Sequence, residues 1–284
     1  MFAQSPSLLM RFVNQGVENG RSEEMLKSLL SVLGVYRVYE KWLWYQVKDE
    51  ARPEHIAIIL DGNRRWALGR SLNPYIGHYY GADKTERLLR WCLDFGVKTI
   101  TLFVFSTENF KRPQEEVDEL MQLFREKLRG LLENDDIHKH RARVKAIGRL
   151  NLLPEDIQQM IGEVEEATKS YDEHFLNFAM AYGGRAEIVD AARKIAQEVK
   201  DERLSPDDID EEIFEENLYT AHLPKQDPDL VIRTSGEERL SGFLLYQSAY
   251  SELFFLDVFW PEFRRIDILR AIRTFQRRKR RFGQ

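Results

Sequence analysis

The sequence predicts an α/β protein with a single domain, built on a mainly parallel sheet of about six strands that is flanked by helices. Short apolar runs alternate with segments of helical periodicity from residue 54 onward. This alternation is typical of parallel strands joined by right-handed crossovers. No repeat, low-complexity segment or Pro/Gly-rich linker divides the 284 residues. We therefore expect an N-terminal helical extension over residues 1–53 and one domain over residues 54–284.

The predicted elements follow one another in a regular order. Apolar, partly β-branched runs predict strands over residues 55–60, 99–105, 143–148, 175–182, 229–234 and 253–258. Helical periodicity predicts helices over residues 79–95, 113–132 and 185–199, and another that begins at residue 154. Gly96 suits the end of the first of these helices, and Pro113 and Pro154 suit the starts of two others.

The N-terminal extension carries apolar residues at steps of three and four, which predicts a helix. These residues are Leu26, Leu29, Leu30, Leu33 and Tyr36. An aromatic strip that includes Trp42 and Trp44 continues the pattern. The favoured interpretation is a helix packed on the body of the protein. The alternative is an amphipathic helix whose tryptophans touch a membrane or an oily product.

Composition and charge exclude several classes of protein. The net charge of −5 does not suggest binding to nucleic acid. A basic run from Arg264 to Arg281 is interpreted as a solvated helix face. Cys92 is the single cysteine, which excludes disulfides and cysteine zinc sites within one chain. Without a membrane-spanning run or signal-peptide pattern, we expect a cytoplasmic protein with at most a peripheral membrane contact.

Polar residues gather where the predicted strands end. In a parallel sheet, sites form outside the carboxyl ends of the strands. The loops at these ends read DGNRRW after the first strand, STENFKRP after the second, YGGR after the fourth and RTSGEERLS after the fifth. Glu252 directly precedes the last strand. We expect these groups to share one rim.

The rim combines arginines with carboxylates, which suits diphosphate chemistry. Guanidinium groups bind phosphate oxygens in a bidentate way, and several arginines together match two diphosphates. Asp61, with Glu252 close in space, is suited to hold Mg²⁺ that bridges diphosphate oxygens and stabilises a leaving pyrophosphate. Taken singly, each residue has a plainer explanation as part of a turn, a helix cap or a surface ion pair. Their joint placement carries the hypothesis.

Common nucleotide and hydrolase motifs are missing from the sequence. It contains no P-loop, no GxGxxG after the first strand, no HExxH and no GxSxG. Apolar residues on strands and a helix border the same rim, namely Leu88, Leu102, Val104, Phe178 and Met180. They are expected either to line a tunnel for a hydrocarbon chain or to form plain core.

Several long segments resemble the cis-prenyltransferase family of the undecaprenyl diphosphate synthase type. They are HIAIILDGNRRWA, GH at 77–78, FSTENFKRP, AYGGR, DLVIRTSGEERLSGFLLYQSAYSELFF and a closing RRFG. The extension is similar to those of archaeal and eukaryotic members. The resemblance implies an α/β fold around an apolar tunnel, a homodimer, and Mg²⁺-dependent condensation of isopentenyl diphosphate with an allylic prenyl diphosphate. The implied product is a polyprenyl diphosphate, the precursor of a glycosyl carrier lipid.

The resemblance also implies roles for individual residues. Asp61 corresponds to the catalytic aspartate that holds Mg²⁺, and Glu252 to the second metal ligand. Asn109 corresponds to the asparagine often given the proton-acceptor role, although an amide is a poor base and is better suited to orient the diphosphate oxygen that takes the proton. The positions that correspond to substrate-binding residues are Gly62, Asn63, Arg64, Arg65, Trp66, His78, Ser106, Glu108, Phe110, Arg112, Arg233, Arg239 and Ser241. Arg281 and Gly283 correspond to an Arg-x-Gly that reaches the neighbouring subunit.

Three positions depart from the family's pattern, and they leave alternatives open. Asn73 and Pro74 stand in the segment where the family usually carries an arginine for the allylic diphosphate, Phe110 replaces a tryptophan and Glu238 a histidine. The first departure motivates a second hypothesis, in which a short prenyl group passes to another acceptor such as an alcohol. A silent partner subunit is a third and disfavoured hypothesis, because such partners lose the Asp-Gly-Asn loop. The primer, with geranylgeranyl diphosphate as one candidate, and the product length stay open.

Overall fold

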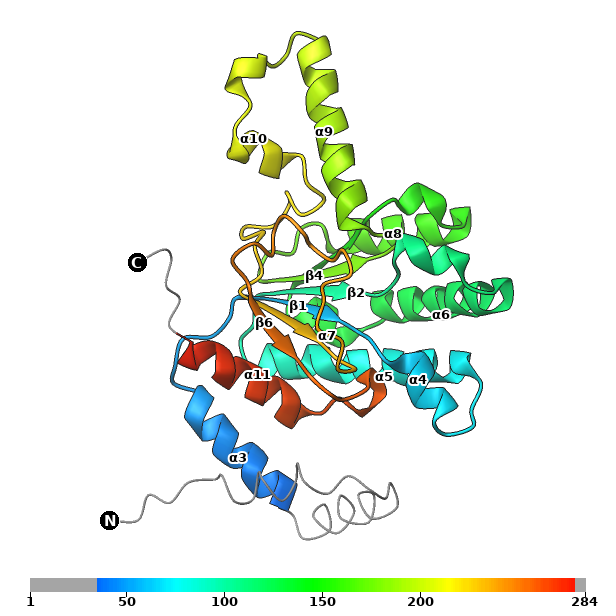
Figure 1. Ribbon diagram of the computed structural model, residues 1–284, viewed down its shortest axis with the longest axis vertical. Coiled ribbons are helices and arrows are strands. Elements are labelled where there is room, and N and C mark those ends of the chain that lie inside the picture. The colour runs from blue at the N-terminus through cyan, green and yellow to red at the C-terminus, as the bar shows by residue number, and fades with distance from the viewer. Residues whose placement is uncertain (1–34, 279–284) are drawn as a thin grey trace.

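The computed structural model describes residues 35–278. Within this range it contains one sheet of six parallel strands in the order β3-β4-β2-β1-β5-β6, with helices on both faces (Figure 1). The strands are β1 (His55–Ile59), β2 (Thr99–Phe103), β3 (Ala142–Ile147), β4 (His174–Ala179), β5 (Leu230–Arg233) and β6 (Glu252–Phe255). The predicted fold class and all six predicted strands are confirmed.

The helices of the described range connect and cover these strands. They are α3 (Val35–Val47), α4 (Asn63–Leu68), α5 (Pro74–Asp94), α6 (Gln114–Leu132), α7 (Asp135–Lys139), α8 (Glu155–Thr168), α9 (Gly184–Lys200), α10 (Glu211–Glu216) and α11 (Arg265–Arg277). Short 3₁₀ turns are η1 (Thr107–Lys111), η2 (Leu150–Leu152), η3 (Pro206–Asp208) and η4 (Trp260–Glu262). One expectation needs correction: DGNRRW runs into helix α4 rather than a loop. The described part of the basic run forms α11, a helix whose apolar side is buried.

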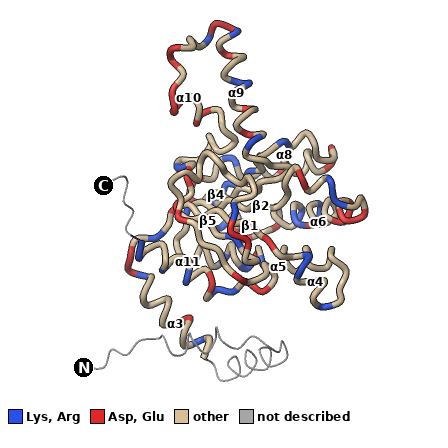
Figure 2. The backbone as a smooth tube through the Cα atoms, viewed as in Figure 1, with Lys and Arg blue, Asp and Glu red and all other residues tan. Residues whose placement is uncertain are grey.

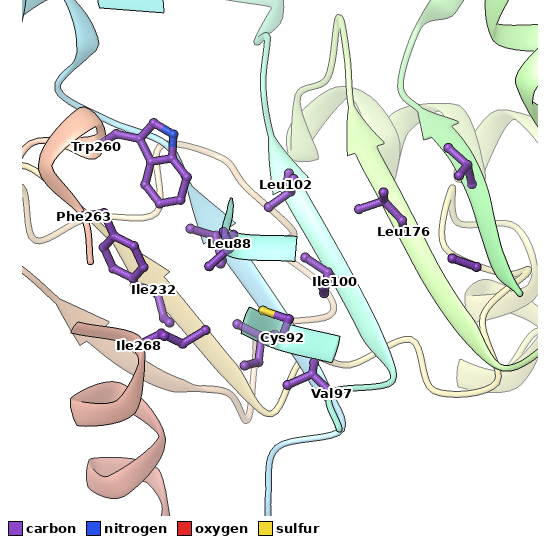
Figure 3. Close-up of a cluster of buried hydrophobic side chains, with 14 of the residues drawn as sticks. Leu88, Cys92, Val97, Ile100, Leu102, Leu176, Ile232, Trp260, Phe263 and Ile268 are labelled. Atoms are coloured by element: carbon purple, nitrogen blue, oxygen red, sulfur yellow. The ribbon is translucent and has the colours of Figure 1, made fainter. Parts of the chain in front are cut away.

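The main core lies between the sheet and the helices on one of its faces. Side chains alternate along a strand, so Ile100 and Leu102 of β2 point to the same face. Leu88 and Cys92 of α5 pack against this face, and Trp260 closes it at one end (Figure 3). Strand β1 is buried along its whole length because it lies between β2 and β5 with both faces covered.

Gly62 sets the sharp transition from β1 to α4. Its φ of +105° lies in a region that side chains rarely adopt, and an added Cβ would lie 2.6 Å from a ring carbon of Phe259. The chain can therefore turn directly from the strand into the helix only because residue 62 lacks a side chain.

Helix α3 lies along α11, so the described part of the N-terminal extension packs on the body of the protein. Glu40 pairs with Arg265 at 2.8 Å, and Gln276 donates to the carbonyl of Val47 at 3.0 Å. The predicted helical segment from Leu26 to Leu33 lies outside the described residues. Among residues 35–278, no helix is both long enough and apolar enough to cross a membrane.

Helices α9 and α10 extend away from the sheet and carry much of the negative charge (Figures 1 and 2). Acidic residues gather around their outer ends, including Asp201, Asp207, Asp208, Asp210 and Glu211. This charge therefore lies apart from the carboxyl ends of the strands. The negative net charge of the chain does not preclude a cationic site at those ends.

A buried polar chain crosses three strands on the face of the sheet opposite α5. His55 Nε2 lies 2.8 Å from Thr101 Oγ1, which also accepts a hydrogen bond of 3.2 Å from the amide of Asn177. Asn177 Oδ1 lies 2.8 Å from His222 Nε2. Burial lowers the pKa of His55 and that of His222, each to about 4, so both imidazoles are neutral near pH 7.

We predict that this network makes the fold sensitive to acid. The pKa of His55 is about 4 in the folded chain against an ordinary value of 6.5, so the unfolded chain binds the proton first as pH falls. The stability that neutral His55 contributes is complete above pH 6.5 and lost towards pH 4, an effect of about 3 kcal/mol. Urea unfolding at several pH values should show this loss, and His55→Gln should flatten it. Equal slopes in both proteins would contradict the prediction.

Candidate active site

The centre of the site is an ion pair at the carboxyl edge of the sheet. Parallel pairing places Ile59 of β1 opposite Arg233 of β5, so Asp61 and Arg233 lie at the same edge. Arg233 Nη2 lies 2.7 Å from Asp61 Oδ2, and Arg65 Nη2 lies 3.3 Å from Asp61 Oδ1. Burial raises the pKa of Asp61, but hydrogen bonds and the charges of both arginines outweigh it and hold the pKa below its ordinary value. Asp61 is therefore ionised.

Arg233 organises the turn that follows β5. Its Nη1 donates to Ser241 Oγ at 2.8 Å and to the carbonyl oxygen of Arg239. Arg233 is only 4% exposed, and its buried Nε has no hydrogen-bond partner. The described residues therefore supply no acceptor for this N–H group.

Glu237 forms ion pairs with two further arginines near this turn. It pairs with Arg239 and lies 3.3 Å from Arg65 Nη1. Arg65 also donates to Ser235 Oγ at 2.6 Å. Arg239 and Glu237 therefore belong to a network that reaches Asp61 through Arg65.

The loop after β2 presents Asn109 through a capping interaction. Asn109 Oδ1 accepts a hydrogen bond of 3.0 Å from the backbone N–H of Ser106. Glu108 is exposed beside it, and the ring of Phe110 meets Phe105 edge-on with centroids 4.8 Å apart. Since the amide oxygen of Asn109 is engaged, its Nδ2 group is the part left to bind a ligand, and it can only donate.

A second cluster of charges lies beside this loop, around Glu116. The carboxylate of Glu116 accepts from Arg112 at 2.9 Å and lies 3.3 Å from Arg64 Nε and 3.4 Å from His78 Nε2. The hydrogen bond with His78 and the charges of both arginines lower the pKa of Glu116. Burial lowers the pKa of His78. Sequence reasoning missed Glu116, although its spacing of four residues from Arg112 on a helical segment was a usable signal.

The unusual Asn73 and Pro74 serve the start of α5. Asn73 Oδ1 accepts from the backbone N–H of Tyr75 at 3.4 Å, and Pro74 is the first residue of the helix. Neither residue lines the cavity. Arg64 and Arg112 bring two cations to the rim, so the site retains positive charge without an arginine in this segment.

A large cavity opens at this rim and continues between the sheet and helices α5 and α6. Its volume is about 1300 Å³. Apolar side chains of both helices and of β2 and β4 form most of its wall, including Leu89, Leu93, Ile100, Val104, Leu123, Phe124, Phe178 and Met180. The lining continues to Val97 and His174 at the opposite edge of the sheet, so the cavity spans the length of the strands.

Most of the predicted site residues meet at the mouth of this cavity. Those that line it are Asp61, Gly62, Asn63, Arg64, Arg65, His78, Ser106, Glu108, Asn109, Arg112, Arg233 and Ser241. Trp66, Phe110 and Arg239 do not line it: Trp66 is buried and donates to Glu262 at 3.3 Å. Of the candidate tunnel residues, Val104, Phe178 and Met180 line the cavity, whereas Leu88 and Leu102 are fully buried core. Arg281 and Gly283 lie outside the described residues.

The expected proximity of Glu252 to Asp61 is wrong within one copy of the chain. Glu252 is the first residue of β6 and lies opposite Leu230, the first residue of β5. Because the strands are parallel, a residue that begins a strand lies at the amino edge, whereas Asp61 follows the end of a strand. Glu252 instead pairs with Arg278 at 2.6 Å.

The described residues suit a cation held by one carboxylate and its substrate. Residues 35–278 contain no group of three or more His, Cys, Asp or Glu side chains arranged to hold a metal ion. Mg²⁺ commonly binds proteins through one or two carboxylates, with water and substrate phosphates as its other ligands. Asp61, ionised at the cavity mouth beside Arg65 and Arg233, fits that mode.

Known proteins resemble this chain over most of its length. A family model described as "Putative undecaprenyl diphosphate synthase" matches residues 59–283. The chain is 53% identical over 251 residues to a tritrans,polycis-undecaprenyl-diphosphate synthase (geranylgeranyl-diphosphate specific) of Methanocaldococcus jannaschii, covering 88% of this chain and 90% of that protein. It is 55% identical over 255 residues to the protein of the same name from Methanopyrus kandleri, covering 90% of this chain and 93% of the relative.

A solved structure extends the likeness from sequence to fold. The crystal structure of lavandulyl diphosphate synthase from Lavandula x intermedia, in complex with dimethylallyl diphosphate, superimposes with a TM-score of 0.79 at 37% identity. The superposition covers 82% of this chain and 99% of the lavender enzyme. The chain therefore belongs to the undecaprenyl diphosphate synthase family of prenyltransferases.

Proposed function

We propose that this prenyltransferase condenses isopentenyl diphosphate with an allylic prenyl diphosphate to give a polyprenyl diphosphate, the precursor of a glycosyl carrier lipid. The observation that carries this proposal is the cavity of about 1300 Å³, with arginines and Asp61 at its mouth and apolar side chains along its length. A substrate with a charged head and a hydrocarbon tail matches both parts. The tail is buried against apolar side chains while the head stays among cations.

In this proposal Asp61 holds Mg²⁺ together with diphosphate oxygens. Bound there, the ion would stabilise the charge that develops on departing pyrophosphate. Arg64 and Arg112 converge on Glu116, whereas Arg233 pairs with Asp61, so two diphosphates have separate cationic partners. Interactions that strengthen as the allylic C–O bond breaks lower the barrier more than equal binding of the substrate would.

Asn109 orients a diphosphate rather than removing a proton. Its amide oxygen is engaged by the backbone N–H of Ser106 at 3.0 Å, which leaves its Nδ2 to donate. A proton lost from the condensing isopentenyl unit then passes to a diphosphate oxygen that this amide positions. The buried Nε of Arg233, which has no partner, is a second donor to the same class of ligand.

We extend the proposal to substrate and assembly. The archaeal relatives are named as geranylgeranyl-diphosphate specific, and we propose that primer for this chain. We also propose a homodimer in which Arg281 and Gly283 of one copy serve the site of the other. A peripheral membrane contact through α3 is supported by Val38, Trp42 and Tyr45, which are exposed along one side of that helix. We also propose that the N-terminal extension ends at residue 53 and that the catalytic domain begins at residue 54.

We predict that Asp61→Asn lowers kcat at least about 100-fold, because the amide loses the charge that holds the cation. Product formation from labelled isopentenyl diphosphate measures the effect. Asp156→Asn is the matched control, since Asp156 forms an exposed pair with Arg125 at 2.5 Å. This control should retain wild-type activity. An Asp61→Asn enzyme with normal turnover and a normal thermal transition would overturn the assigned role.

The substrate assignment is tested with the purified chain, Mg²⁺ and labelled isopentenyl diphosphate. Geranyl, farnesyl and geranylgeranyl diphosphate are supplied in turn, and we predict the highest kcat/KM with geranylgeranyl diphosphate. Mass spectrometry of the product should show a ladder spaced by one isoprene unit. No incorporation with any primer would count against condensation, whereas a prenyl ether formed with an alcohol would establish the alternative acceptor.

A further inference from the structure

A buried tyrosine joins two loops of the site without lining the cavity. Tyr182 follows β4 and is fully buried. Its backbone N–H donates to the carbonyl of Phe105 at 3.1 Å, and its carbonyl accepts from the N–H of Thr107 at 3.0 Å. These bonds attach Tyr182 to the segment of residues 106–112, which carries Asn109 and is called the Asn109 loop below.

The hydroxyl of the same tyrosine reaches the turn that carries Ser241. This Ser241 turn comprises residues 239–244. The backbone N–H of Leu244 donates to the Tyr182 hydroxyl at 3.2 Å. Phe243 of the turn stacks on Phe103 of β2 with centroids 4.8 Å apart, and both rings meet the edge or face of Tyr182.

The Ser241 turn depends on such support because its backbone is strained. Ser241 and Leu244 have φ values of +49° and +43°, a region that non-glycine residues rarely adopt. On the cavity side, Arg233 binds the Ser241 hydroxyl. On the far side, the Tyr182 hydroxyl and the N–H of Gly184, which donates to the Gly242 carbonyl at 2.8 Å, hold the turn.

Glu187 anchors the Tyr182 hydroxyl. Glu187 is 1% exposed and accepts hydrogen bonds from the Tyr182 hydroxyl, from the N–H of Tyr219 at 2.9 Å and from Gln247 Nε2 at 3.0 Å. Neither Tyr182 nor Glu187 lines the cavity. Burial raises the pKa of Tyr182, so its hydroxyl stays protonated and donates to Glu187 while it accepts from Leu244.

We propose that Tyr182, anchored by Glu187, is a positioning residue that holds the Ser241 turn in a fixed relation to the Asn109 loop. The inference rests on the proposed function and on the family resemblance, in which the positions of Arg233, Arg239 and Ser241 correspond to the isopentenyl diphosphate site. This connection keeps a fixed distance between the Ser241 turn, which binds one diphosphate, and Asn109, which orients the reacting groups. Loss of the hydroxyl frees the turn, whereas the backbone bonds to the Asn109 loop remain.

The matched variants are Tyr182→Phe and Tyr219→Phe. Each removes one hydroxyl, and the two rings are neighbours with centroids 6.1 Å apart. The Tyr219 hydroxyl donates to Asp190 at 2.5 Å and has no bond to the Ser241 turn. Calorimetric titration with isopentenyl diphosphate, without a primer, measures binding independently of turnover. Steady-state assays give the KM for each substrate.

Tyr182→Phe should weaken isopentenyl diphosphate binding and raise its KM about tenfold, because the Leu244 N–H loses its acceptor. The KM for the allylic primer should change less than about twofold, and Tyr219→Phe should match the wild type in both constants. Adding Ser241→Ala to Tyr182→Phe should cost little more than either change alone, because both release the same turn. A purely structural role would instead raise both KM values or lower only the melting temperature.

Equal effects of the two tyrosine variants, or unchanged binding in both, would overturn the proposal. Should Tyr182→Phe fail to fold, Glu187→Gln replaces it. An amide nitrogen in place of the carboxylate oxygen that accepts from the Tyr182 hydroxyl would leave that hydroxyl without its acceptor, and this is expected to weaken binding about threefold. A wild-type chain that binds isopentenyl diphosphate without turning it over contradicts the proposed function alone. A wild-type chain that binds none contradicts both.

Discussion

The ion pair between Asp61 and Arg233 is the constraint on which the arrangement of the site depends. β1 and β5 are adjacent, parallel and in register, so Asp61 and Arg233 lie at the same edge of the sheet. A guanidinium that is 4% exposed is stable only when most of its N–H groups have acceptors. The acceptors for Arg233 are Asp61, Ser241 and the carbonyl of Arg239. Arg233 therefore connects the segment after β1 to the turn after β5.

Much of the fold could be predicted from the sequence because parallel strands have a simple signature. Each apolar run bounded by turn residues corresponded to a strand, and residues directly after a strand, such as Asp61, were placed on the correct rim. The same reasoning failed for Glu252, because that residue precedes its strand and belongs to the opposite edge. The edge of the sheet at which a residue lies depends on whether the residue precedes or follows its strand, and not on how near to the strand it is.

Other features depend on contacts that no local pattern records. Glu116 matters because Arg64, Arg112 and His78 converge on it from three segments. Leu102 and Val104 are both apolar and lie two residues apart, yet only Val104 lines the cavity, whereas Leu102 is fully buried core. The sequence showed apolar residues at both positions, and packing alone separated core from wall.

The two faces of the sheet differ in polarity and in role. The face toward α5 and α6 is apolar and encloses the cavity. The opposite face carries the polar chain from His55 to His222 and the contacts of Glu187. Hydrogen bonds are directional, so they suit the face that holds loops in place, whereas undirected apolar contact suits a wall along which a growing chain slides.

Among the described residues, every arginine that is proposed to bind a diphosphate has an acidic neighbour. Arg65 pairs with Asp61 and Glu237, and Arg64 and Arg112 share the single charge of Glu116. An incoming anion must displace a resident countercharge, so it gains less than the number of guanidiniums suggests. When pyrophosphate has formed, the same carboxylates compete to recover their partners and hasten its escape. The cavity mouth thus binds its diphosphate substrates less tightly and releases pyrophosphate faster. This suits an enzyme that repeats the same addition many times on one growing chain.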